Sequence, residues 1–151
     1  MYKKVLFASL AAALGAGYAV SAFSQAKPEV LVKQRQSAMT LQLKYFLPLA
    51  LMAQGKIPYD ANVAARNAAY LDTLTQMAWD GFTDGTKGTK SGALPAVFTD
   101  TAKFKQAQDQ LRTAVGGLVA ASKSGNEGAV KAAVGDVNKA CGNCHDNFRA
   151  Q

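Results

Sequence analysis

The stretch from Asn126 to Arg149, NEGAVKAAVGDVNKACGNCHDNFR, decides the fold of this 151-residue chain. Asparagine is a favoured N-terminal cap of an α-helix, because its side chain accepts a hydrogen bond from a free backbone N–H. Apolar side chains then follow at steps of four or three residues: Val130, Val134, Val137, Cys141, Cys144 and Phe148. This spacing brings them onto one helix face. The stretch therefore predicts an amphipathic helix with two cysteines in its buried stripe.

The two cysteines belong to the motif Cys141-Gly142-Asn143-Cys144-His145, which matches the C-x-x-C-H attachment pattern of c-type haem. Two thiols at this spacing can add to the two vinyl groups of one porphyrin edge. The thiols and the imidazole share one helix face, so all three point to one place. His145 is the only histidine in the chain. The motif predicts one haem c, attached through Cys141 and Cys144, with His145 as the axial ligand of iron.

Other roles for the two cysteines fit the rest of the chain less well. An exported protein commonly joins its cysteines in a disulfide, but a disulfide within one helix is strained. A thioredoxin-type redox pair opens a helix after a strand, and no strand pattern precedes these cysteines. A zinc site needs four ligands, and the sequence has no second cysteine or histidine cluster. Haem attachment uses every residue of the motif.

Three segments upstream also have the period of amphipathic helices. The first is expected from Pro28 to Gln54, with Pro48 kinking it or splitting its end. The second is expected from Asp60 to about Phe82, and the third from Thr99 or Asp100 to Ser124. Residues 83–95 are rich in Gly, Thr and Lys and predict a long loop. Four helices without a strand pattern predict an all-α, antiparallel up-down four-helix bundle that encloses a covalently bound haem.

The same periodicity predicts which side chains of these helices point inward. Those of the second helix are Val63, Arg66 or Asn67, Tyr70, Leu74, Met77 and Ala78. Those of the third helix are Phe104, Ala107, Leu111, Val115, Leu118 and Val119.

The first 26 residues have the pattern of a secretory signal peptide. Lys3 and Lys4 precede an apolar run over residues 5–23, and small residues within 22–26 offer cleavage sites. A membrane anchor is the alternative, but the run is rich in Ala and Gly and only weakly hydrophobic. Residues 27–151 are expected to form one exported domain in the periplasm, without membrane insertion after cleavage.

Charge and composition restrict the classes of function. Without Lys3 and Lys4 the chain has 15 basic and 10 acidic side chains, a formal net charge of +5. The basic residues are spread along the chain and are not interleaved with aromatics, so no nucleic-acid partner is predicted. The sole histidine is committed to iron and no nucleophile–base pair is apparent, so no enzyme is predicted. The sequence does not identify a redox partner protein.

Essentially the whole of residues 27–151 resembles the cytochromes c′, the high-spin class II c-type cytochromes. The resemblance rests on Lys27-Pro28-Glu29, Arg35-Gln36-Ser37-Ala38-Met39, Gly55-Lys56-Ile57-Pro58-Tyr59-Asp60, Trp79 with Phe82, Phe104-Lys105-Gln106, and Cys141 to Arg149. The C-x-x-C-H motif alone indicates only c-type haem. The Arg35-Gln36 segment combined with a C-terminal motif is far more specific.

The resemblance implies pentacoordinate iron with His145 as the proximal ligand and no strong ligand on the opposite face. Arg35 and Gln36 match residues that hold the haem propionates. Met39 matches an apolar side chain that closes the distal face, and Arg149 matches a basic residue beside the proximal histidine. The resemblance also implies binding of NO and CO, and an antiparallel homodimer formed through the first two helices.

Met39 separates two hypotheses for function. It follows Arg35 by one helical turn, so both side chains face the same side of the first helix. Packing of Met39 against the haem fits a gas-binding protein, and the fuller family pattern favours it. The alternative is a low-spin electron carrier with Met39 as the sixth ligand, because methionine can ligate haem iron and raise its potential. Trp79 is expected to pack in the core, to contact the haem, or both.

Overall fold

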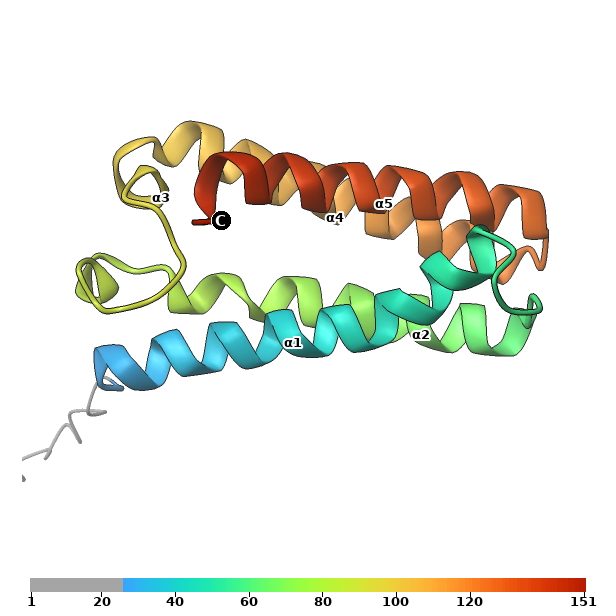
Figure 1. The fold of residues 1–151 in the computed structure, drawn as a ribbon, viewed down its shortest axis with the longest axis horizontal. Helices are drawn as coiled ribbons and strands as arrows, with labels where there is room; N and C mark the ends of the chain where they lie inside the picture. The colour runs from blue at the N-terminus through green and yellow to red at the C-terminus, as the bar shows by residue number, and fades with distance from the viewer. Residues whose placement is uncertain (1–25) are drawn as a thin grey trace, which may run out of the picture.

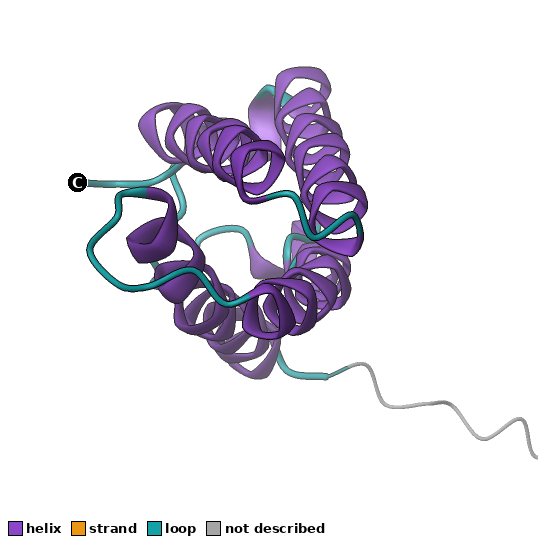
Figure 2. Ribbon diagram, turned by 90° about the vertical axis from the view of Figure 1, so that its right-hand side faces the viewer, coloured by secondary structure: helices purple, strands orange, loops and turns teal. Residues whose placement is uncertain are grey.

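The computed structural model describes residues 26–151, so the expected signal peptide, apart from Ala26, lies outside the described residues. Four long helices build the fold: α1 (Pro28–Ala53), α2 (Ala61–Met77), α4 (Thr101–Lys123) and α5 (Glu127–Phe148). Consecutive helices pack side by side and α1 also packs against α5, so the four close into a ring (Figure 2). The chain reverses direction at each connection (Figure 1). The predicted antiparallel up-down bundle is confirmed.

The helix boundaries follow local chemistry. The Asp60 carboxylate accepts hydrogen bonds from the backbone N–H groups of Asn62 and Val63 at 2.8 and 3.0 Å, which caps α2. The Asn126 side chain accepts a 2.9 Å bond from the N–H of Ala129 and caps α5, as predicted. Pro48 lies inside α1, and the last turns of that helix bend towards α5 in Figure 1.

The connection between α2 and α4 is more structured than predicted. The second helix does not continue to Phe82, because α2 ends at Met77 and a 3-10 turn, η1 (Trp79–Gly81), follows. The expected loop also contains a second 3-10 turn, η2 (Asp84–Thr86), and it leads into the short helix α3 (Ala96–Thr99). Helix α4 begins at Thr101, next to the predicted start.

The predicted inward face of α2 is partly wrong. Tyr70 is 46% exposed and Met77 is 58% exposed, whereas Asn67 and Ala78 are buried as predicted. The buried face of α2 consists of Ala64, Asn67, Ala68, Leu71 and Thr75. Most of these buried side chains are small, whereas the larger Tyr70 and Met77 lie at the surface.

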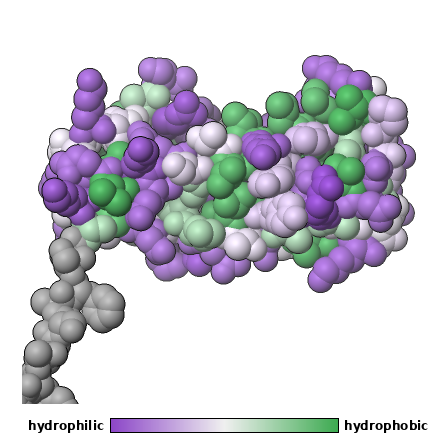
Figure 3. Space-filling view, turned by 90° about the horizontal axis from the view of Figure 1, so that it is seen from below, coloured by the Kyte–Doolittle hydropathy of each residue, from purple (hydrophilic) through white to green (hydrophobic). Residues whose placement is uncertain are grey.

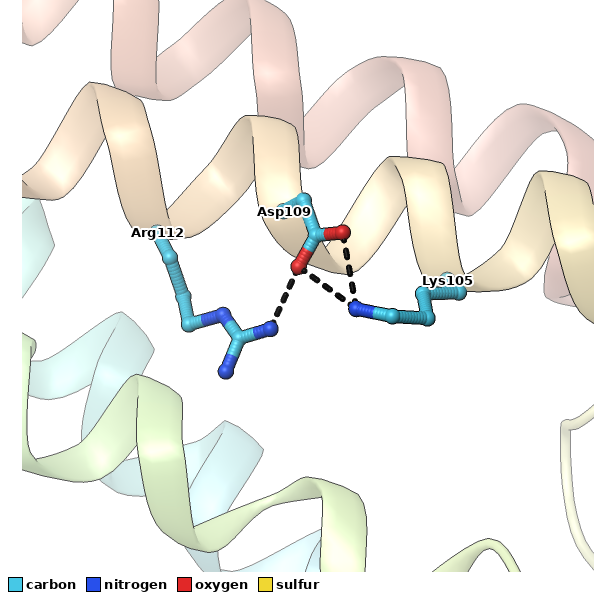
Figure 4. A network of polar contacts seen from close by, with 3 residues as sticks. All are labelled: Lys105, Asp109 and Arg112. Carbon is cyan, nitrogen blue, oxygen red and sulfur yellow. Dashed lines mark hydrogen bonds and ion pairs between the residues drawn. The ribbon is translucent and has the colours of Figure 1, made fainter.

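The predicted stripes of α4 and α5 are largely confirmed. The buried apolar residues of these two helices include Phe104, Ala107, Leu111, Val115, Leu118, Val130, Val134, Val137 and Phe148. Val119 and the two cysteines are only partly buried. On the outer surface of α4, the Asp109 carboxylate pairs with Lys105 at 2.9 Å and also with Arg112 (Figure 4).

The core is divided into two parts along the bundle. The large core cluster includes Leu49, Leu71, Val115, Leu118 and Val137 and joins all four long helices. The small core cluster consists of Val97, Phe104, Ala107 and Phe148, near the α3 end of the bundle. Within residues 26–151, no helix has the length and apolar character needed to cross a bilayer.

Candidate haem site

The C-x-x-C-H motif occupies the last turns of α5, where the two core clusters meet. Cys141 packs against the large core cluster, and Cys144 packs against the small one. They are not joined in a disulfide. Burial raises the pKa of both, and the neighbouring Cys141 helps to raise the pKa of Cys144 to about 11. The motif therefore presents two neutral thiols on the inner side of α5.

His145 directly follows Cys144 and is exposed. Partial desolvation lowers the pKa of the imidazole, and the positive charge of Arg149 lowers it further, although Asp146 acts in the opposite direction. A neutral imidazole keeps a nitrogen lone pair, which is the form that binds a metal. The chain's only histidine is thus suited to ligate iron beside the two thiols.

Arg35 is a buried cation on α1, with only 3% of its surface exposed. Its Nη1 donates hydrogen bonds to the carbonyl oxygen of Gly81 at 2.6 Å and to Oγ1 of Thr86 at 3.2 Å. Its Nη2 donates to Oγ of Ser91 at 2.8 Å. The guanidinium carbon lies 4.3 Å from the centre of the Phe82 ring. Burial lowers the pKa of this guanidinium.

The partners of Arg35 are all uncharged. Within residues 26–151 it forms no ion pair, since the four observed ion pairs involve other basic residues. A buried charge without a counter-ion is unfavourable. Three of the five guanidinium N–H groups are engaged, which leaves Nε–H and one Nη2–H for a further acceptor. Such a cation fits an anionic group of a cofactor, such as a haem propionate.

The other predicted site residues have different surroundings. Met39 is partly buried on α1, one turn beyond Arg35, whereas Gln36 is exposed. Trp79 is partly buried, and its Nε1 is enclosed without a hydrogen-bond partner within residues 26–151. The Arg149 side chain is exposed, next to the end of α5. The orphaned indole N–H is a second polar group that an acceptor on a cofactor would satisfy.

Trp79 also belongs to an aromatic group around the small core cluster. Its ring lies 6.2 Å from that of Phe82 and 6.1 Å from that of Phe104, measured between centroids. Phe104 in turn lies 5.1 Å from Phe148, one turn beyond Cys144. The contacts of Phe104 with Trp79 and Phe148 are edge-to-face, and contacts of this kind stabilise an apolar wall. An apolar wall beside the two cysteines of the motif suits the hydrophobic ring of a porphyrin.

Sequence reasoning missed the part played by the connection between α2 and α4. Thr86 and Ser91 bind Arg35, and Ala93 forms an isolated antiparallel bridge with Arg149. The bridge is reinforced by a 2.8 Å bond from the N–H of Ala150 to the oxygen of Gly92. Glycine and threonine in a polar segment are typical of a solvated loop. The sequence of this segment therefore does not indicate that it contacts Arg35 or the end of α5.

A wide groove on the outer surface lies elsewhere, between α4 and α5. Its lining includes Gln110, Ala114, Gly117, Ala133 and Asp136. It contains no residue of the motif and none of the other predicted site residues, so it is not the haem site. The two cysteines, the buried cation without a counter-ion and the aromatic wall instead fit haem at the junction of the two core clusters.

Comparison with known proteins agrees with this assignment. Residues 30–149 match the model of the family described as Cytochrome C'. Cytochrome c' of Rubrivivax gelatinosus is 47% identical over 124 residues, covering 82% of this chain and 96% of the relative.

Solved structures of cytochrome c prime from Alcaligenes xylosoxidans are similar as well. A nitric oxide complex of one mutant superimposes with a TM-score of 0.78 at 38% identity, covering 83% of this chain and 98% of the other. A carbon monoxide-bound variant gives the same score, identity and coverage.

Proposed function

Because the chain belongs to the cytochrome c′ family, we propose that it is an exported haem protein that binds NO or CO at pentacoordinate iron. As a member of this family, the chain carries haem c covalently through its two cysteines, Cys141 and Cys144. The bound haem supplies an iron that takes up a small ligand and exchanges one electron between Fe(II) and Fe(III). The proposed function is ligand binding and electron transfer, not catalysis.

The observation that carries the proposal is the pairing of two half-buried thiols with the chain's only histidine on the last turns of α5. His145 is the proposed proximal ligand, and its lowered pKa supports the neutral form at pH 7. No second imidazole exists for the opposite face of the iron. Arg149, one turn further along the chain, is proposed to lie beside the proximal imidazole.

Arg35 and Gln36 are proposed to hold the haem propionates. The burial of Arg35 among uncharged partners supports this role, because a propionate would supply the missing counter-ion. Gln36 is exposed and would reach a propionate only at the surface of the bundle. The enclosed Nε1 of Trp79 supports a contact between that indole and the haem.

Met39 is proposed to close the distal face of the haem without binding iron. Its partial burial one turn beyond Arg35 supports a packing role on α1. NO and CO bind ferrous haem strongly enough to displace a packed side chain, whereas a weakly bound ligand does not. A low-spin electron carrier with Met39 as the sixth ligand is the alternative function.

We further propose that two copies of the chain form an antiparallel dimer through α1 and α2. The large apolar side chains exposed within residues 26–151 all lie on these two helices or the turn between them: Val30, Leu41, Leu43, Leu47, Ile57, Tyr70 and Met77. Figure 3, which views the molecule from the side of α1 and α2, shows apolar groups on the surface. An apolar surface of this kind supports association with a partner.

Residues 1–26 are proposed to direct export to the periplasm and then to be removed, leaving residues 27–151 as the mature domain. The charged start, the apolar run and the small residues at 22–26 support this proposal. Attachment of haem c outside the cytoplasmic membrane is implied by the family.

Visible absorption spectra of the purified holoprotein test the proposed function. High-spin ferric and ferrous spectra, with a new ferrous species on addition of NO or CO, are expected. A low-spin spectrum in both oxidation states that Met39→Ala converts to high-spin would establish the electron-carrier alternative. Absence of a Soret band would contradict both functions.

A further inference from the structure

The glycine-rich connection at residues 83–92 contains one side chain that is unusually buried for a polar loop. Thr86 is 1% exposed, although most of its neighbours in sequence are in contact with solvent. A buried hydroxyl is unfavourable unless its hydrogen-bonding groups are satisfied. The contacts of Thr86 therefore indicate why the chain buries it.

The Thr86 hydroxyl is both a donor and an acceptor. Its single proton has two candidate acceptors, the carbonyl oxygen of Thr83 at 2.8 Å and that of Gly81 at 3.2 Å. Its oxygen accepts the 3.2 Å bond from Nη1 of Arg35. Since Nη1 also donates to Gly81, the two acceptors together fix one amino group of the guanidinium.

Ser91 fixes the other amino group. Its Oγ accepts from Nη2 of Arg35 at 2.8 Å and from the backbone N–H of Ala93 at 3.3 Å. Ala93 is the residue that bridges to Arg149 at the end of α5. The connection is therefore joined both to Arg35 on α1 and to the segment that follows the C-x-x-C-H motif.

These contacts engage both amino groups and leave Nε–H and one Nη2–H unengaged. We propose that Thr86 and Ser91 are positioning residues that orient the Arg35 guanidinium towards a haem propionate. The inference rests on the proposed role of Arg35 and extends it to the loop. Without the hydroxyls, the long arginine side chain would gain rotational freedom, and its hydrogen bond to the carboxylate would weaken.

Resonance Raman spectroscopy of the holoprotein tests this inference, because the propionate bending bands report hydrogen bonding to the carboxylates. Thr86→Val keeps the shape of the side chain but removes the hydroxyl. We expect it to shift a propionate band to lower frequency and to lower the reduction potential, because a less compensated carboxylate favours Fe(III). Thr86→Ser should restore both values.

Thr89→Val is the matched control, since Thr89 lies in the same loop and its side chain forms no hydrogen bond within residues 26–151. It should leave the band and the potential unchanged. Ser91→Ala is a second test at a partly buried position, and it should shift both values in the same direction as Thr86→Val.

Arg35→Gln separates failure of the inference from failure of the proposed function. If Arg35→Gln shifts the band while Thr86→Val and Ser91→Ala change only thermal stability, both hydroxyls are merely structural and the inference is wrong. If Arg35→Gln also leaves the band and the potential unchanged, Arg35 does not hold a propionate, and that part of the proposed function is wrong.

Discussion

Arg35 on α1 and Gly81 at the end of η1 are in close contact through both backbone and side chain. Nη1 of Arg35 donates a 2.6 Å hydrogen bond to the carbonyl oxygen of Gly81. A methyl group at position 81 would lie 2.8 Å from Cβ of Arg35 and 2.7 Å from the carbonyl oxygen of Leu31. Only glycine lets η1 approach α1 this closely, and the approach brings the carbonyl within reach of the guanidinium.

Gly81→Ala should therefore destabilise the protein. Its new Cβ meets backbone on α1, which cannot yield as a flexible side chain can, so a loss of about 2 kcal/mol in the free energy of unfolding is expected. Denaturant unfolding of the holoprotein measures this loss of free energy. Gly92→Ala is the control, because a Cβ there meets no atom within 4 Å. Equal stability of the two variants would contradict the close packing.

The sequence predicted best where large apolar residues carry the helical period. Helix α5 and the position of its motif were predicted because apolar residues from Val130 to Phe148 recur at helical spacing, and the valines of this stripe are buried. In α2 the buried face consists mostly of small residues such as Ala64 and Ala68. The apolar pattern assigned Tyr70 to the core because Tyr70 is a large side chain at helical spacing. The pattern does not indicate that small alanines form the buried face instead.

The hydrogen bonds of the loop could not be predicted from sequence for a different reason. Thr86 is 51 residues from Arg35 and Ser91 is 56 residues from it. Only the packed bundle brings them together. No local propensity of a Gly- and Thr-rich segment indicates such a partner, so the sequence predicted a solvated loop.

His145→Ala should leave haem attached through its thioether bonds but should remove the proximal ligand. The ferric absorption spectrum is expected to change, because no other imidazole can replace it. Asn143→Ala, an exposed change inside the same motif, is the control and should keep the wild-type spectrum. An unchanged spectrum in the His145 variant would mean that another group ligates the iron.

Leu43→Glu should weaken the proposed dimer. Leu43 is 62% exposed on α1, so the change should leave the fold of the monomer intact. Burying an unpaired carboxylate at an interface is costly, and about a tenfold or greater weakening of dimerisation is expected. Sedimentation equilibrium measures it. Ala120→Glu, at an exposed position of α4, is the control. Equal association of both variants with the wild type would place the interface elsewhere.

Asp109→Asn should reduce stability slightly and in a pH-dependent way. Hydrogen bonds from Lys105 and Arg112 lower the pKa of the Asp109 carboxyl (Figure 4). A lowered pKa stabilises the fold above the unfolded-state pKa, and this contribution is lost as the pH falls through the folded-state pKa. The effect is small because the pair is exposed.

Thermal unfolding at neutral and acid pH measures this difference. The melting temperature of Asp109→Asn should be lower than that of the wild type at neutral pH and should converge with it in acid. Asp136→Asn is the control, because Asp136 forms no ion pair within residues 26–151. A difference that persists in acid would assign the effect to helix propensity instead of charge.

Met39→Ala should open the distal face of the haem. Met39 is partly buried one turn beyond Arg35. In its proposed packing role it competes with incoming ligands, and truncation to alanine would remove this competition. CO association should accelerate at least about tenfold if displacement of Met39 contributes 1.4 kcal/mol or more to the barrier, and autoxidation should increase. Flash photolysis measures the rate of CO association. Thr40→Ala, at an exposed position beside Met39 on α1, is the control. The packing account also requires high-spin iron in both forms, so conversion from low-spin to high-spin by Met39→Ala would make Met39 a ligand.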